Sequence, residues 1–216
     1  MRKKSESKTS YVQFDEIETS HRTQLLPLAI AFAVRPKTGD IITAHVAPIE
    51  SRQLQRIARR KYGFRESKRE QAVCATLRDV REVVMDENGF TIASDSWLKY
   101  PEWIHQEIPF ANHERHSGEN LKTREKAMAL VDFDGELVDW SETEDSGQYW
   151  MKVRKNGRRV VKAFDPLFCV NQKCARLRSA LSRLRKHWWG YTQKIEYLEH
   201  HLWLFIAVNN GYSLRY

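Results

Sequence analysis

The sequence has few cysteines, and none of them follows a metal-binding or disulfide pattern. The three, Cys74, Cys169 and Cys174, form no CxxC motif and cannot all pair, which argues against a disulfide framework and a four-ligand zinc site. Long apolar runs are absent as well, because no stretch approaches the ~20 residues that span a bilayer. The charged start MRKKSESKTS lacks the apolar segment of a signal peptide. We therefore expect a protein of a reducing cytoplasm with no membrane partner.

What the chain does contain is enough apolar material for a core and an excess of positive charge. Of its 216 residues, 41% are hydrophobic and 11% aromatic, which fits one large domain or two small ones. Lys and Arg number 36 against 28 Asp and Glu, for a net charge of +8. This balance favours an anionic partner, with nucleic acid first among the candidates.

The first fifty residues read as three strands. Residues 1–10 are polar and are expected to be a disordered lead-in, so the folded domain would be residues 11–216. Residues 11–19 alternate between apolar and polar side chains, and residues 25–34 are almost continuously apolar. After a turn, residues 41–49 form the next predicted strand. The short connections predict an antiparallel meander.

The middle of the chain alternates between helix and strand. Apolar residues spaced by three and four predict a helix over residues 68–85, which Asp86–Gly89 would end. A short strand is expected at 90–93, followed by a helical piece and another strand at 107–111. Residues 112–163 are polar and are interpreted as a surface insertion or long hairpin.

The last part of the chain is predicted to be helical. A stripe formed by Cys174, Leu177, Leu181, Leu184 and Trp188 indicates a helix from residue 171 to residue 190, and residues 192–209 form a second amphipathic helix. The fold class is therefore α/β (α+β): a mixed sheet with flanking helices, a C-terminal helical pair and a polar insertion.

Two aspartates stand where strands could bring them together. Asp15 lies within the first predicted strand, and Asp95 lies at the end of the fourth. Neighbouring carboxylates repel one another unless a cation lies between them, and carboxylate oxygens suit Mg²⁺ or Mn²⁺. Two such ions about 4 Å apart support in-line phosphoryl transfer. The alternatives are an exposed acid on an edge strand for Asp15 and a helix N-cap for Asp95.

Several stretches resemble the catalytic domain of bacterial insertion-sequence transposases. They are FDEIET, LLPLAIAFAV, TGDIITAHVAPI, RRKYGFRESKRE, IASDSWLKYPEWI and FDPLFCVNQKCARLRSALSRLRKHWWGYTQKIEYLEHHLWLFIAVNNGY. The resemblance covers most of the chain except about residues 112–160, and its last block is the most specific. It implies a ribonuclease-H-like fold and DDE-type chemistry with two ions, Mg²⁺ or Mn²⁺. Asp15 would match the first-strand aspartate, and Asp95 the aspartate after the fourth strand.

The third acid of such an enzyme is expected on the late helix, where this chain has Asn171 and Gln172. Related sequences often have Asn-His or Asp-His there. We take Asn171 as the candidate third ligand, because an amide oxygen can bind Mg²⁺ with less charge. Asp165, which precedes a proline, and Glu196 and Glu199 on the last helix are weaker alternatives. Because Gln172 stands where related sequences have His, a catalytically inactive copy is an alternative.

The resemblance also implies partners. The substrate would be double-stranded DNA, both transposon ends and target, bound by a homo-oligomer in the synaptic complex. Relatives usually carry an N-terminal DNA-recognition segment, whereas this chain starts ten residues before its first predicted strand. We therefore expect a catalytic portion that works with a separate recognition polypeptide in the bacterial cytoplasm, at the nucleoid when bound. The alternatives are a stand-alone nuclease or resolvase of the same fold and a catalytically decayed DNA-binding regulator.

Basic side chains gather in two stretches that could contact the phosphate backbone of DNA. The alternative for both is a solvated helical face. The candidate DNA-binding residues are Arg56, Arg59, Arg60 and Lys61 in the first stretch, and Arg176, Arg178, Arg183 and Arg185 in the second.

Overall fold

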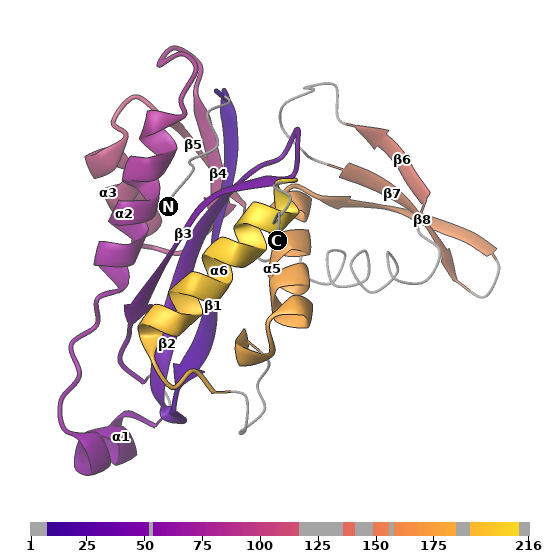
Figure 1. Ribbon diagram of the computed structural model, residues 1–216. Helices are drawn as coiled ribbons and strands as arrows, with labels where there is room; N and C mark the ends of the chain where they lie inside the picture. The colour runs from indigo at the N-terminus through magenta and orange to yellow at the C-terminus, as the bar shows by residue number, and fades with distance from the viewer. Residues whose placement is uncertain are drawn as a thin grey trace.

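The computed structural model describes residues 8–51, 54–116, 136–140, 149–155, 158–184 and 191–211, with 136–140, 149–155 and 158–165 described by their backbone alone. A five-stranded sheet carries helices on both faces, and a three-stranded sheet stands apart from it (Figure 1). The strands of the larger sheet are β1 (Tyr11–His21), β2 (Thr23–Arg35), β3 (Asp40–Pro48), β4 (Thr91–Asp95) and β5 (Asn112–His116). The α-helices are α1 (Gln55–Tyr62), α2 (Arg69–Glu82), α3 (Tyr100–Glu107), α5 (Phe168–Ala180) and α6 (Ile195–Asn209).

The larger sheet is mixed, with strand order β3-β2-β1-β4-β5. β1, β2 and β3 form the predicted antiparallel meander, whereas β4 runs parallel to β1 and β5 parallel to β4. A parallel neighbour needs a crossover connection, and α2 and α3 supply these before β4 and β5. The C-terminal ends of β1, β4 and β5 consequently point the same way.

The apolar run of β2 is buried on both faces of the sheet, as the sequence predicts. Every residue from Leu28 to Val34 is fully buried. Helices cover both faces (Figure 1), so neither face of this strand needs polar side chains.

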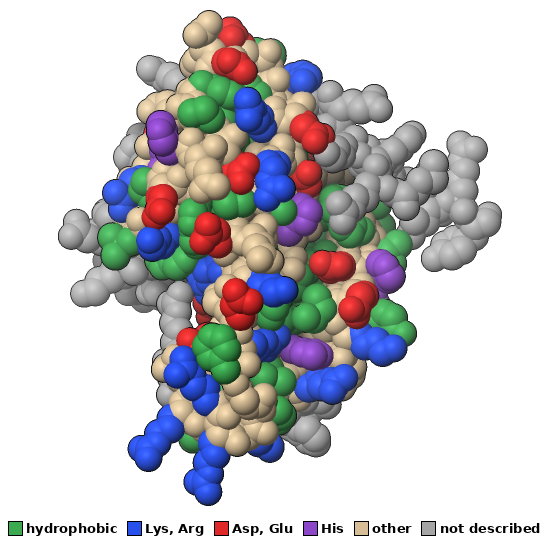
Figure 2. Space-filling model, turned by 90° about the vertical axis from the view of Figure 1, so that its left-hand side faces the viewer, with side chains coloured by type: hydrophobic (Ala, Val, Ile, Leu, Met, Phe, Trp, Pro, Cys, Tyr) green, Lys and Arg blue, Asp and Glu red, His purple; other side chains and the backbone are tan. Residues whose placement is uncertain are grey.

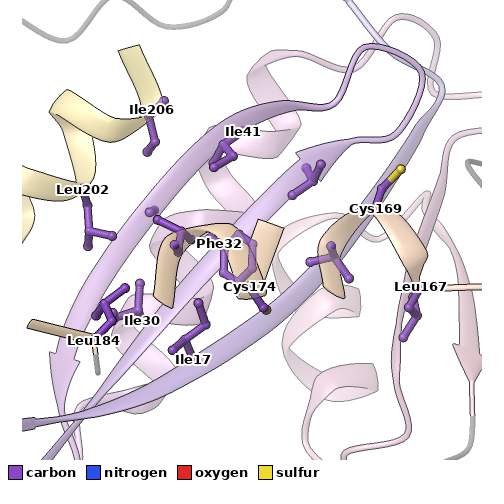
Figure 3. Packing of buried hydrophobic residues seen from close by; sticks show 14 of the residues in the cluster. Ile17, Ile30, Phe32, Ile41, Leu167, Cys169, Cys174, Leu184, Leu202 and Ile206 are labelled. Atoms are coloured by element: carbon purple, nitrogen blue, oxygen red, sulfur yellow. The ribbon is translucent and has the colours of Figure 1, made fainter. Parts of the chain in front are cut away.

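Alternation along the strands divides the interior into two cores. Phe14 and Ala31 face α2 and α3, whereas Ile17 and Phe32 face α5 and α6. Figure 3 shows the second core, where Cys174 of α5 lies close to Phe32. Successive strand residues point to opposite faces, so each of the two faces of β1 has its own environment. This separation decides which acidic residues of β1 can act together.

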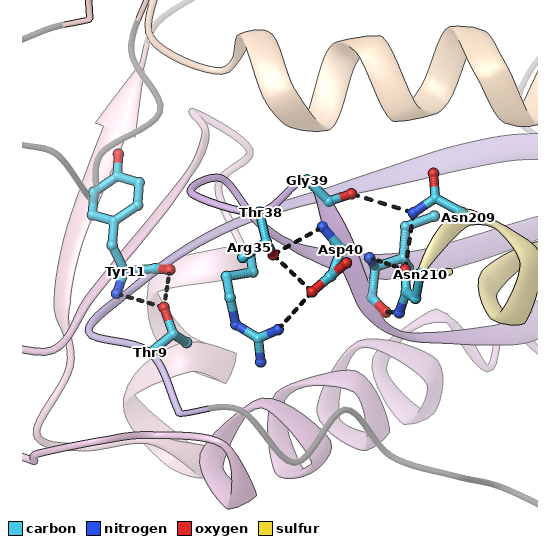
Figure 4. A network of polar contacts seen from close by, with 9 residues as sticks. Thr9, Tyr11, Arg35, Thr38, Gly39, Asp40, Asn209 and Asn210 are labelled. Atoms are coloured by element: carbon cyan, nitrogen blue, oxygen red, sulfur yellow. Dashed lines mark hydrogen bonds and ion pairs between the residues drawn. The ribbon is translucent and has the colours of Figure 1, made fainter. Parts of the chain in front are cut away.

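A polar network joins the β2–β3 turn to the end of α6 (Figure 4). Asn210 Nδ2 donates to the Ile41 carbonyl at 2.8 Å, and the Ile41 N–H donates to Asn210 Oδ1 at 3.0 Å. Within the turn, Arg35 pairs with Asp40 at 3.2 Å. The last helix is thereby fixed on the edge strand β3.

The late helix is shorter than predicted. α5 begins at Phe168 and ends at Ala180, where Leu181 turns to extended backbone with φ −101° and ψ 106°. A 3₁₀ turn, η2 (Ser182–Leu184), follows and returns Leu184 to the core. Spacing by three residues is shared by both helix types, so the apolar stripe did not reveal the break. Residues 185–190 lie outside the described part.

The strand expected at residues 107–111 is wrong. Ile108 and Phe110 pack in a turn after α3, and the strand begins only at Asn112. Pro109 has no N–H to donate to a ladder, which disfavours a strand there.

Two further expectations concern the lead-in at residues 1–10 and the insertion at residues 112–163. Of the expected disordered lead-in, residues 1–7 lie outside the described part, but Thr9 exchanges backbone hydrogen bonds with Val83 and Met85. Residues 112–116 of the expected insertion belong to the main sheet as β5. Beyond them, β6 (Glu136–Trp140), β7 (Tyr149–Lys155) and β8 (Arg158–Asp165) form the separate antiparallel sheet.

Candidate catalytic site

Asp15 lies within β1 on the face that α5 covers. Its Oδ1 accepts a hydrogen bond from the Glu16 N–H at 2.7 Å, and Cys174 Sγ lies 3.7 Å from its Oδ2. The carboxylate is half-buried rather than exposed, and β1 is a central strand. The alternative of an exposed acid on an edge strand is therefore wrong.

Asp95 is the last residue of β4. Its Oδ1 accepts a hydrogen bond from the Trp97 N–H at 3.0 Å, which holds the turn after the strand. The helix α3 begins only at Tyr100, with Lys99 at its N-cap position. Asp95 is therefore not the cap of that helix, and its side chain stays at the sheet edge.

The register of β1 and β4 brings the two aspartates together. Gln13 pairs with Ala93 in the parallel ladder, and carrying the same offset forward places Asp15 opposite Asp95. Residues an even number of positions apart lie on the same face of a strand. Both carboxylates consequently lie on the α5 face of neighbouring strands.

The start of α5 is fixed to β1 beside this pair. The buried Gln13 side chain donates from Nε2 to the Pro166 carbonyl at 2.8 Å and accepts at Oε1 from the Val170 N–H at 3.0 Å. The Gln13 amide thus uses both its donor and its acceptor. It also gives a partner to the Val170 N–H, which lies in the first turn of α5 and has none within the helix. Gln13 is a residue that sequence reasoning did not single out.

Asn171, the candidate third ligand, is buried in the first turn of α5, with 4% of its surface exposed. It precedes Cys174 by one helical turn, and residues three apart share a helix face. Because Cys174 contacts Asp15, Asn171 lies on the face of α5 that meets β1.

The other candidates for a third acid lie elsewhere. Glu196 and Glu199 belong to α6, which packs on β3, and β2 and β1 separate that strand from β4. Asp165 ends β8 and is described by its backbone alone. Of the candidates whose side chains are described, Asn171 is the one whose helix reaches Asp15.

A second acidic residue of β1 faces the other side of the sheet. Glu16 accepts a hydrogen bond from Tyr100 Oη at 2.8 Å and pairs with Arg69 at 3.3 Å. Burial raises the pKa of Glu16, Arg69 and Tyr100 oppose that rise, and the nearby Asp15 and Glu18 add to it. Burial also raises the pKa of Tyr100, with further contributions from Glu16, Asp15 and Asp95. Acidic side chains therefore gather between the middle of β1 and the end of β4.

β5 adds two residues to the same edge. His116 is the ladder partner of Asp95, and its Nε2 lies 3.8 Å from Glu114 Oε2. Glu114 in turn accepts a hydrogen bond from Tyr11 Oη at 3.2 Å. The sequence alone places both residues in a surface insertion or long hairpin, since only the pairing of β5 with β4 connects them to Asp95.

The predicted basic residues occupy two separate places. Arg56, Arg59, Arg60 and Lys61 are exposed on α1, and Figure 2 shows Lys and Arg side chains gathered at the lower end of the molecule, where Figure 1 places α1. Arg59 is held by Glu50 at 2.6 Å. Arg176 and Arg178 are exposed on α5, whereas Arg183 Nε donates to His201 Nδ1 at 3.2 Å. Arg185 lies outside the described residues.

Within the part of the chain whose side chains are described, no group of three or more His, Cys, Asp or Glu side chains is arranged to hold a metal ion. The candidate donors are instead two carboxylates and the Asn171 amide. None of the described helices combines the length and apolar character that a membrane crossing requires.

Comparison of the chain with models of known families, with curated proteins and with solved structures finds no match.

Proposed function

We propose that the chain is the catalytic portion of a DNA transposase, with a ribonuclease-H-like fold, that cleaves and transfers DNA strands. The observation that supports the proposal is the parallel ladder of β1 and β4, which ends at Gln13 and Ala93 and whose register, carried two residues further, would set Asp15 opposite Asp95. The strand order β3-β2-β1-β4-β5 also fits the sheet that the sequence resemblance implies.

The donor chemistry of this site fits a hard divalent cation. Asp15 and Asp95 offer carboxylate oxygens, and Asn171 offers an amide oxygen, which are the ligand types that Mg²⁺ and Mn²⁺ take. Burial is the main cause of the raised pKa of Tyr100, and the carboxylates of Glu16, Asp15 and Asp95 add to it, so these acidic groups lie near one another. When bound, the metal activates an attacking oxygen and stabilises a leaving oxygen in phosphoryl transfer.

The residues of the chain have distinct parts in this scheme. Asp15 and Asp95 would hold the cation, and the backbone N–H groups of Glu16 and Trp97 orient their carboxylates. Exposed arginines on α1 and α5 bind phosphates of the DNA backbone. Water and a DNA 3′-hydroxyl are the attacking groups, so no protein nucleophile is required.

The test is cleavage of supercoiled and end-containing DNA with Mg²⁺ or Mn²⁺. Asp15→Asn and Asp95→Asn keep the shape of each side chain but remove its charge, so we expect cleavage to fall about a hundredfold or more. Glu87→Gln, at an exposed position before β4, is the matched control and should cut normally. Cleavage that survives both aspartate changes would overturn the proposal, and cutting without joining of labelled ends would indicate a nuclease or resolvase.

A catalytically decayed DNA-binding protein is the second candidate. The observation that favours it is the amide of Asn171 at the place of a third acid, beside a thiol rather than a carboxylate at Cys174. Such a protein would bind DNA equally well with and without a divalent cation, and the aspartate variants would not differ from the parent.

Asn171→Asp tests whether Asn171 is a metal ligand. A third carboxylate should tighten Mn²⁺ binding and raise cleavage about tenfold if the site works with two acids and an amide. Isothermal titration with Mn²⁺ and the cleavage assay measure both effects, with Gln172→Glu, exposed on the same helix, as the control. An unchanged Mn²⁺ affinity would contradict a role of Asn171 as a ligand.

A further inference from the structure

A cavity of about 600 Å³ opens beside the loop that follows Asp95. It lies between the end of β3, the start of α1, the start of α2 and the first turn of α3. Its wall includes Gln55, Arg69, Glu70, Trp97, Lys99 and Trp103. A volume of this order falls within the range of ordinary ligand sites.

Aromatic and guanidinium groups in mutual contact form part of the wall, with the Trp97 and Trp103 rings packed edge-to-face at an interplanar angle of 63°. The rings of Trp97 and Trp103 meet at 5.2 Å between centroids, and Arg69 Cζ lies 4.9 Å from the centroid of the Trp97 ring. Arg69 is held there by its ion pairs with Glu16 and Glu18. A surface that is already ordered loses little conformational entropy when a planar group stacks on it.

The charges around the cavity select against a phosphate group. Glu50 and Glu70 line it, and Arg69 is already paired with two carboxylates. A neutral planar ring meets no such repulsion. Glu70 offers an acceptor, while Gln55 and Lys99, which bind Glu50 and Glu102 respectively, retain further amide and ammonium groups for the hydrogen-bonding edge of a nucleobase.

The position of the cavity connects it to the candidate catalytic pair. The backbone N–H of Trp97 donates to Asp95 Oδ1 at 3.0 Å, so the loop that carries the Trp97 ring also carries the Asp95 carboxylate. Gln55, the first residue of the basic helix α1, lies on another side of the cavity. A DNA strand that runs from α1 toward Asp95 would pass the mouth of the cavity with its phosphates outside.

We propose that this cavity binds one unstacked nucleobase of the DNA on which Asp15 and Asp95 act. The inference rests on the proposed function, because it takes DNA as the ligand. Extrusion of a base from the stack gives the strand a fixed position relative to the carboxylates.

Photo-crosslinking tests the proposal without any catalysis. A single-stranded oligonucleotide that carries 5-iododeoxyuridine is irradiated with the intact chain in metal-free buffer, and the crosslinked peptide is identified by mass spectrometry. We expect the crosslink at Trp97 or Trp103. Crosslinks confined to Tyr62 and Phe64, the exposed aromatics around the end of α1, would overturn the proposal.

Binding by fluorescence anisotropy gives an independent readout. Trp97→Leu should weaken binding of the oligonucleotide about tenfold. Because Trp97 also packs on Tyr100, Ser67→Trp serves as a second variant: Ser67 is exposed and lines the cavity, so the larger ring fills the space without disturbing the core. Tyr197→Leu, an exposed aromatic on α6, is the control and should bind normally.

The outcomes separate this inference from the proposed function. Cleavage that depends on Asp15 and Asp95, together with unchanged oligonucleotide binding by Ser67→Trp and Trp97→Leu, would overturn the proposal of base binding in the cavity and leave the catalytic function standing. A crosslink at Trp97 in a chain that never cuts DNA would support the cavity and overturn the catalytic function. A chain that binds no oligonucleotide at all would overturn both.

Discussion

At the scale of single residues, the neighbours of each acid decide its role more than the residue type does. Asp15 and Glu16 are adjacent in the sequence, yet alternation sends them to opposite faces of the sheet. Asp15 meets α5 and Cys174, whereas Glu16 is buried between Tyr100 and Arg69. Burial raises the pKa of Glu16, and its contacts link β1 to α2 and α3. Glu16 therefore acts on the structure, whereas Asp15 lies on the face where the proposed site would be.

His113 offers a test of such an environment away from the aspartates. Its Nε2 lies 2.8 Å from Ser94 Oγ, and burial, followed by Arg115 and His116, lowers its pKa. The neutral imidazole is thus favoured in the folded state. Its contribution to stability is present above the ordinary pKa of 6.5 and is lost as the pH falls through the lowered value.

We therefore expect His113→Gln to lose less stability than the parent between pH 7 and pH 5. Urea unfolding at the two pH values measures the difference. His105→Gln, at an exposed position on α3, should behave like the parent. An equal loss in His113→Gln would show that this side chain does not contribute to the pH dependence.

At the scale of elements, the site depends on how α5 is held over β1. The helix offers Asn171 and Cys174 toward the sheet, but its own sequence does not say which strand they meet. Gln13 supplies that connection through two hydrogen bonds, to Pro166 and Val170. The break at Leu181 then ends the helix, so Arg183 lies in the following 3₁₀ turn and not on the helix that carries Arg176.

Removal of the Gln13 amide should loosen this contact. Gln13→Leu leaves the Pro166 carbonyl and the Val170 N–H buried without their partner, so we expect the free energy of unfolding to fall by about 2–4 kcal/mol. Cleavage should fall further than folded fraction alone explains, because α5 sets the position of Asn171. Chemical denaturation and the cleavage assay measure the two effects.

Gln71→Leu, an exposed amide on α2, is the control for this change. A loss of stability in Gln13→Leu no larger than in Gln71→Leu would contradict the role given to the Gln13 hydrogen bonds.

At the scale of the whole molecule, the charged side chains that give the net charge of +8 are unevenly distributed. The basic side chains of α1 gather at one end of the face in Figure 2, while acidic residues gather between the middle of β1 and the end of β4. A polyanion would be attracted first to α1, and cations to the aspartates. This separation is consistent with one surface for DNA binding and another place for chemistry.

The salt dependence of DNA binding tests the contribution of α1. The double variant Arg56→Ala, Arg60→Ala removes two exposed cations, so the slope of log K against log salt concentration should fall by about 1–2. Lys37→Ala, in the exposed β2–β3 turn, should leave the slope unchanged. A double variant with the slope of the parent would show that α1 does not contact the DNA backbone.

The sequence by itself determined the local elements of this protein. The continuous apolar run of residues 25–34, the stripe over residues 68–85 and the alternation of residues 11–19 each predicted the right type of element, because burial imposes a period on apolar residues. The mixed α/β class followed from the same patterns, and none of the helices in the described ranges is long and apolar enough to cross a membrane.

Only the tertiary structure decided what these elements bring together. The parallel ladder that brings β1 beside β4, His116 beside Asp95, and Cys174 against Asp15 all depend on strand register and on where α5 lies. The cavity beside Trp97 likewise joins residues from three helices and the end of β3. Such contacts link positions far apart in the chain, and no local periodicity records them, because register is set by pairing and packing across the whole sheet.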